Sequence, residues 1–213
     1  MFLIMNRYIL LLCLASLSSC IGKHQSGAQT AEVSEQVSSL TEPVGDTLKI
    51  NVSKSKIFWK GTKMRGAGKH EGEIQIKEGF FVSKESKLIG GAFLVDMHSI
   101  EVTDIPKSDP IPIKNLTNHL KSDDFFDVEN YSTSRFEISN IEKLASDSLK
   151  ISGNLTLKNV TKSIGFIALN RDKTFSTKFT IDRFQWNIAY KGNWTDKTFV
   201  DKDLELTIEL VIE

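Results

Sequence analysis

The sequence has almost no cysteine and no excess of either charge. Cys13 and Cys20 are its two cysteines among 213 residues. The chain beyond residue 20 therefore carries no disulfide, no thiolate nucleophile and no cysteine metal ligand. The 27 lysine and arginine residues balance 27 aspartate and glutamate residues. Because nucleic-acid binding needs a basic surplus to neutralise phosphates, this balance argues against a nucleic-acid partner.

Long hydrophobic runs are also scarce, and the clearest one is short. It extends from Tyr8 to Leu17, follows Arg7 and contains no acidic residue. This is about half of the roughly 20 residues that a membrane-spanning helix needs, so residues 1–19 are predicted to form a signal peptide. The following Leu17-Ser18-Ser19-Cys20 resembles the lipobox of bacterial lipoproteins. That resemblance implies acylation of Cys20 and anchoring in the bacterial cell envelope, on the periplasmic side or at the outer membrane. A Sec signal peptide ending near a cysteine and a buried N-terminal strand remain alternatives.

Residues 20–45 contain no aromatic residue and are rich in Ser, Gln, Thr, Ala and Glu. Such a composition buries too little apolar area to offset the entropy lost on ordering. We therefore predict a flexible tether over residues 20–45, followed by one folded domain over residues 46–213.

From residue 46 onward the dominant hydrophobic period is two, as in Phe93/Val95/Met97 and Phe175/Thr177/Phe179/Ile181. This alternation is typical of antiparallel strands with one buried face. Turn-forming residues such as Lys77-Glu78-Gly79 and Lys158-Asn159 separate about eight such runs. An exception is residues 114–122, where the spacing of Leu116 and Leu120 predicts a short helix. The sequence thus predicts an all-β domain, either a closed antiparallel barrel of about eight strands or a two-sheet sandwich.

An eight-stranded barrel is either filled by side chains or holds one small ligand. Thirteen Phe stand against three Tyr and three Trp, so most of the aromatic surface has no polar group. No ionisable residue occurs among the inward-period positions, which predicts an apolar, uncharged ligand; an ordinary packed core is the alternative. The residues predicted to line the cavity are Phe93, Val95, Phe136, Ile138, Leu155, Leu157, Phe179 and Ile181.

Polar residues within the strands allow a functional and a structural interpretation. Asp96, His98 and Ser99 are expected to satisfy backbone groups where a strand ends. Residues 123–127 are acidic, but they lack the spacing of a calcium loop and are expected to form a loop pinned by hydrogen bonds rather than an ion site. Arg183 is a charge on an otherwise apolar strand. It is interpreted either as a contact to the head group of a ligand or as a paired surface arginine.

Five blocks of residues stand out in order along the chain. They are Gly68-Lys69-His70-Glu71-Gly72-Glu73-Ile74, residues 90–100, Asn118-His119-Leu120-Lys121-Ser122-Asp123-Asp124-Phe125-Phe126-Asp127-Val128, Gly153-Asn154-Leu155-Thr156-Leu157-Lys158-Asn159-Val160-Thr161-Lys162 and residues 179–190. This series resembles the YceI-like family of bacterial extracytoplasmic proteins. The resemblance covers residues 46–213 and implies an extended, lipocalin-like antiparallel barrel whose cavity holds a long isoprenoid or a related amphiphile. It carries over no catalytic residue, metal or cofactor.

These observations favour a non-enzymatic protein that binds, transports or sequesters an apolar isoprenoid-like or fatty-acyl lipid. The expected partners are that lipid and a membrane, which the protein contacts through its anchor. The oligomer considered for the protein is a homodimer. Two alternatives remain. One is an enzyme acting on a small amphiphile through His70, His98 or His119, although their spacing matches no metal site or catalytic triad. The other is a surface adhesion or assembly module with a filled core.

Overall fold

A computed structural model of the chain describes residues 27–37, 43–189 and 200–213. The predicted signal peptide, Cys20 and parts of the predicted tether lie outside these ranges. Within them, no helix has both the length and the apolar character needed to cross a bilayer.

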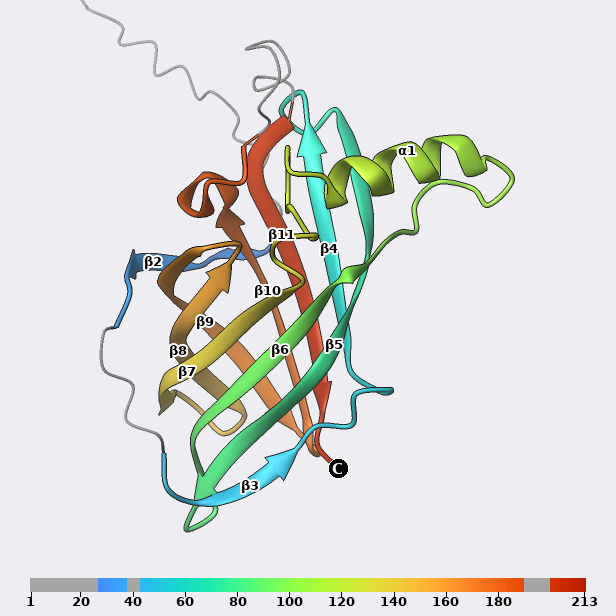
Figure 1. Cartoon of the computed structure of the whole chain (residues 1–213). Coiled ribbons are helices and arrows are strands. Elements are labelled where there is room, and N and C mark those ends of the chain that lie inside the picture. The colour runs from blue at the N-terminus through green and yellow to red at the C-terminus, as the bar shows by residue number, and fades with distance from the viewer. Residues whose placement is uncertain (1–26, 38–42, 190–199) are drawn as a thin grey trace, which may run out of the picture.

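Eight antiparallel strands close into a barrel (Figure 1). Each strand pairs with the next along the chain, β11 pairs with β4, and the pairing of β9 with β10 completes the circuit. This confirms the predicted all-β barrel and its number of strands, and the closure excludes the sandwich. The barrel strands are β4 Lys56–Lys63, β5 Gly68–Lys84, β6 Lys87–Val102, β7 Thr133–Lys143, β8 Ser148–Leu157, β9 Val160–Arg171, β10 Thr174–Asp182 and β11 Val200–Val211; a short strand outside it, β3 Asp46–Lys49, pairs with β5.

The turn predicted at Lys77-Glu78-Gly79 is wrong, because β5 runs through it as one strand of 17 residues. The pairing of β5 with β6 shifts register between Ile76 and Glu78, which identifies a β-bulge. At Gly79 a Cβ would lie 2.5 Å from the ring of Phe93. The glycine therefore allows an inward aromatic ring to lie over the neighbouring strand rather than making a turn.

The predicted helix is α1, Pro110–Lys121, and it packs against β6. It begins earlier than its hydrophobic spacing indicated, because proline is well tolerated in a first helical turn, where N–H groups have no intrahelical partner. Leu120 is buried and Leu116 packs against the core, as their shared face predicted. A 3-10 helix, η1 Arg183–Trp186, follows β10.

The prediction of a flexible tether is wrong for residues 29–35, which we call the strap. They form β1 Gln29–Thr30, parallel to β10, and β2 Glu32–Glu35, antiparallel to β9. β9 and β10 pair directly with each other only at Leu169–Arg171 and Thr174–Ser176, so each leaves backbone groups open beyond that point. A polar segment orders there because those groups offer it a hydrogen-bond ladder that composition alone does not reveal.

Candidate ligand cavity

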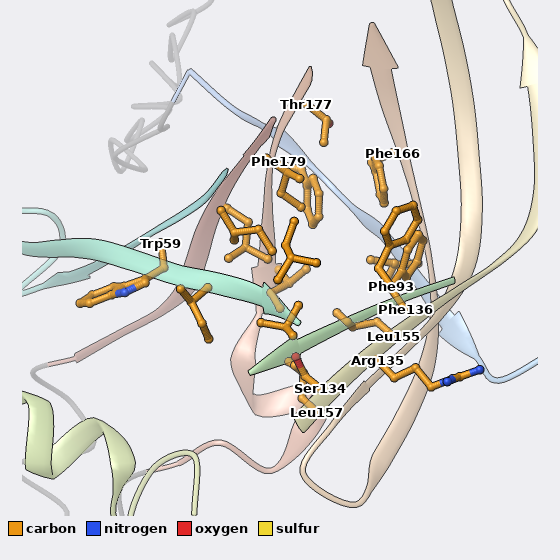
Figure 2. A pocket seen from close by; sticks show the side chains of 18 of the residues that line it. Trp59, Phe93, Ser134, Arg135, Phe136, Leu155, Leu157, Phe166, Thr177 and Phe179 are labelled. Atoms are coloured by element: carbon orange, nitrogen blue, oxygen red, sulfur yellow. The ribbon is translucent and has the colours of Figure 1, made fainter. Parts of the chain in front are cut away.

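Inward-facing side chains from all eight barrel strands enclose a cavity of about 150 Å³. All eight residues predicted from the period of two lie in its wall, and Figure 2 shows Phe93, Phe136, Leu155, Leu157 and Phe179 around it. The alternation therefore identified the interior surface correctly. Contact between these residues and a ligand stays a prediction.

Aromatic rings occupy much of the barrel interior. Phe81 stacks on Phe175 with ring centroids 4.3 Å apart, and Phe166 stacks on Phe179 at 4.4 Å with an interplanar angle of 12°. Phe93 packs edge-on against Phe81 at 5.0 Å. The first stack joins β5 to β10, which are distant in sequence, and the second joins the consecutive strands β9 and β10. The rings therefore hold the barrel together and also shape the cavity.

Several wall residues were not predicted, because they lie outside the period-two runs that predicted the strands. Phe81 follows another phenylalanine, Phe80, and Phe166 and Ala168 belong to an apolar run over residues 164–169. In such runs both faces are apolar, so alternation cannot tell inside from outside. Trp59 is a further wall residue, and its alternation with outward Phe58 and Lys60 was a usable signal.

The cavity wall is almost free of polar groups. Thr177 uses its hydroxyl to donate to the carbonyl of Ile167 at 2.7 Å. Arg135 belongs to the wall, but its guanidinium donates to Glu137 at 2.8 Å, and Figure 2 shows the side chain extending away from the other wall residues. The hydrogen bond to Glu137 raises the pKa of Arg135. Among the residues that the structure describes, the wall contains no histidine and no carboxylate, so these residues give a charge placed inside no partner.

Arg183 is neither a surface residue nor a member of the cavity wall, and the interpretation of it as a paired surface arginine is wrong. It is 2% exposed and donates to the carbonyls of Ile188, Val200 and Asp201 at 2.5, 3.0 and 3.1 Å. Burial lowers its pKa from the ordinary value for arginine. All three donor nitrogens are bound to backbone, so the structure gives no support to the predicted head-group contact.

Aromatic residues next to Arg183 close the end of the barrel at which Arg183 lies. The guanidinium carbon of Arg183 lies 5.5 Å from the ring centre of Phe125, which comes from the loop after α1. Trp186 is fully buried and donates its indole N–H to the carbonyl of Leu155 at 3.0 Å. Phe126 belongs to the cavity wall. The loop after α1 and η1 thus form one cap.

The polar residues at 96–99 satisfy backbone groups as predicted, although β6 does not end there. Ser99 donates to the carbonyl of Asp96 at 2.6 Å and accepts from the backbone N–H of Gln75 at 2.7 Å. The carboxylate of Asp96 accepts from the N–H of His98 at 2.9 Å. These bonds lie where the pairing of β5 with β6 shifts register.

The three histidines within the described ranges, His70, His98 and His119, lie apart from the cavity. His70 is 3.1 Å from Asp104 between Nδ1 and Oδ2, and burial lowers the pKa of His119. His98 is exposed. In the described parts of the chain, no cluster of three or more His, Cys, Asp or Glu residues could hold a metal ion.

Comparison with known proteins places this barrel in a family. Residues 48–212 match the YceI-like domain. BcnA of Burkholderia cenocepacia is 20% identical, with a TM-score of 0.59 over 76% of this chain and 98% of that one. A polyisoprenoid-binding domain from Saccharophagus degradans, implicated in plant cell wall breakdown, is 11% identical, with a TM-score of 0.56 over 78% of this chain and 97% of that one. No curated protein matches the chain. Both structural likenesses concern the fold, and the domain match shows that this chain belongs to the YceI-like family.

Proposed function

We propose that the protein is a non-enzymatic binding module that holds an apolar isoprenoid-like or fatty-acyl chain in its barrel. The observation that carries this proposal is the composition of the cavity wall. The wall residues on the eight strands are apolar except Ser134, Thr177 and Arg135, and the Arg135 side chain extends away from the other wall residues. The Saccharophagus degradans domain of similar fold is described as polyisoprenoid-binding, which supports the same ligand class.

Burial of hydrocarbon is sufficient to give such a complex its affinity. Each methylene group moved from water into the cavity contributes about 0.8 kcal/mol. A ligand with many carbons therefore needs few polar contacts, in keeping with this wall. A charged metabolite would instead lose its hydration without gaining a counter-ion, at a cost of several kcal/mol.

The cavity is small for a long chain. An apolar cavity of about 150 Å³ is of the size that accepts a benzene molecule in an engineered protein. A longer chain requires the stacked phenylalanines to change rotamer, and removal of rings from the interior provides the space. Ligand binding is therefore expected to change the packing of Phe166 and Phe179.

Filling the cavity is expected to abolish binding. Ala168 is 2% exposed and lies in the wall, so Ala168→Leu places added carbons in the ligand's space. We expect the affinity for the methyl ester of cis-parinaric acid, a neutral fluorescent fatty-acyl probe, to fall at least tenfold. Fluorescence titration with geranylgeraniol as unlabelled competitor measures this. Overpacking costs about 1–3 kcal/mol of stability, so binding is compared only where circular dichroism shows folded protein.

The matched control is Ile167→Leu, at a residue next to Ala168 that is 46% exposed. It should bind the probe as the parent does. A folded Ala168→Leu protein with unchanged affinity would show that the probe binds elsewhere. Binding of AMP by a parent protein that ignores the apolar probe would overturn the ligand class, and chemical conversion of recovered probe would favour an enzyme.

We further propose that acylated Cys20 anchors the domain to the cell envelope. The order of a basic residue, a short apolar run, two serines and Cys20 supports this proposal. The anchor would keep a lipid-binding domain beside its source of ligand.

Cys20→Ser is expected to move the protein from the membrane fraction to the soluble fraction. A single acyl chain binds a membrane only marginally, whereas several chains on one cysteine bind stably, so loss of the acylated residue should release nearly all of the protein. Immunoblots of fractionated cells measure the distribution. Cys13→Ser removes the other cysteine and should leave the distribution unchanged. Membrane retention of Cys20→Ser equal to that of Cys13→Ser would refute the anchor.

A further inference from the structure

The barrel wall has a seam between β9 and β10. Their direct pairing stops at Leu169 and Ser176, and beyond it the two strands are joined through the strap. Ala31 donates to the carbonyl of Thr180 on β10, and Glu32 to Glu35 pair with Lys162 to Gly165 on β9. The strap lies outside residues 48–212, so it is not part of the matched family domain.

Two side-chain amides fasten the ends of the strap. Gln29 donates from Nε2 to the carbonyl of Ile167 at 2.7 Å and accepts from the N–H of Ile167 at 2.8 Å. At the other end, buried Asn154 bonds in the same two-way manner to the backbone of Val37, at 3.0 and 3.1 Å. These amides imitate a strand partner at the two places where the ladder ends.

Little apolar area holds the strap in place. Ala31 is buried and Val33 is partly buried against the core. Its other contacts include backbone bonds, the amide bonds of Gln29 and Asn154, and a hydrogen bond between the hydroxyls of Thr180 and Thr30 at 3.5 Å. Two ion pairs, Lys150 with Glu32 at 3.0 Å and Lys162 with Glu35 at 2.7 Å, have exposed glutamates. Exposed ion pairs add little stability, so the strap has the properties of an element that opens locally without unfolding the barrel.

The inner side of the seam is the cavity wall. Phe166 on β9 and Phe179 on β10 stack across it, and both line the cavity. Release of the strap would leave that stack and the hydrogen bond from the Thr177 hydroxyl to the carbonyl of Ile167 as connections between the two strands at this level. In contrast, the cap near α1 is held by three hydrogen bonds of the buried Arg183 and by the buried indole of Trp186. The seam is therefore easier to open than the cap.

We propose that the strap covers a lateral passage between β9 and β10, through which an apolar chain reaches the cavity. This inference rests on the proposed function. The strap detaches from β9 and β10, the Phe166 and Phe179 rings part, and the chain slides in sideways. Rebinding of the strap restores the wall. The passage lets a ligand of any length enter, because the chain does not have to thread through the cap.

A reversible cross-link tests the passage. Ser34 on β2 and Ser163 on β9 are paired residues, so Ser34→Cys/Ser163→Cys in a full-length Cys13→Ser/Cys20→Ser background can form a disulfide that locks the strap. We expect the oxidised protein to release the methyl ester of cis-parinaric acid at least tenfold more slowly than its reduced form, measured by stopped-flow displacement with geranylgeraniol. Gln29→Ala removes one fastening and should speed release about tenfold.

The matched control locks a different strand pair. Asp46→Cys/Ser83→Cys in the same background joins β3 to β5, away from the seam, and oxidation should leave the release rate unchanged. If the oxidised strap variant binds and releases probe as fast as its reduced form, the lateral passage is wrong while the proposed function stands. If neither the parent nor the reduced protein binds any apolar probe, the proposed function and the passage both fall.

Amide hydrogen exchange provides a second measurement that needs no ligand. The N–H groups of Ala31, Val37 and Ile167, all bonded across the strap, should exchange together and at least a hundredfold faster than the amides between β5 and β6. Equal protection of the two sets would show that the strap opens only with the whole barrel, and would overturn the passage.

Discussion

Replacement of Arg183 by alanine is expected to lower the free energy of unfolding by about 3–5 kcal/mol. The variant leaves the carbonyls of Ile188, Val200 and Asp201 without their donor. A buried acceptor without a partner costs about 1–3 kcal/mol. The ring of Phe125 also loses its contact with the guanidinium. Urea denaturation followed by circular dichroism measures the change.

Two variants separate the geometry of Arg183 from its charge. Arg183→Lys keeps a positive charge but lacks the planar guanidinium that reaches all three carbonyls, so it should recover only part of the loss. Arg171→Ala removes an exposed arginine that lies 2.6 Å from Asp147 and should cost about 1 kcal/mol or less. A loss at Arg183 no larger than that at Arg171 would contradict the role of Arg183 in holding the cap.

Phe179→Ala is expected to destabilise the protein by about 3–5 kcal/mol and to weaken retention of an apolar probe. The residue is 2% exposed, and its ring stacks on Phe166 in the cavity wall. The variant removes a large part of the apolar surface that a bound chain would contact. Thermal denaturation measures stability, and retention is followed as the residence time of the fluorescent ester.

The control for this variant is Phe58→Ala, which removes the same side chain from an outward position that is 37% exposed. It should cost about 1 kcal/mol or less and leave the residence time unchanged. Since loss of stability can itself speed release, Phe179→Ala is compared with Phe136→Ala, a second wall residue, at temperatures where both are equally folded. Unchanged residence in both wall variants would place the ligand outside the barrel.

The positions of most barrel strands and part of the cavity wall could be predicted because both depend on a local pattern, whereas β4 and β9 lay outside the predicted runs. In an antiparallel barrel each strand has one solvent-exposed and one buried face. Apolar residues at every second position, such as Phe93 and Val95, therefore indicate which face is buried. The same rule fails where an outward residue is also apolar, as beside Phe81 and Phe166. The sequence also predicted a turn at residues 77–79, where the structure has a β-bulge, because glycine occurs in both turns and bulges.

By itself, then, the sequence determined an antiparallel all-β domain with an apolar interior, since a hydrophobic period of two can be buried in few other ways. The pairings of β9 with β10 and of β11 with β4 decided that this domain is a closed barrel rather than a sandwich. Only the tertiary structure decided the roles of Arg183 and the strap. Arg183 is buried because carbonyls from residues 188, 200 and 201 converge on it. The polar strap is ordered because β9 and β10 diverge and leave an open ladder on each side. Both outcomes depend on backbone groups brought together by folding. Every residue type carries a backbone carbonyl and all but proline an N–H, so the pattern of side chains does not reveal where these groups meet.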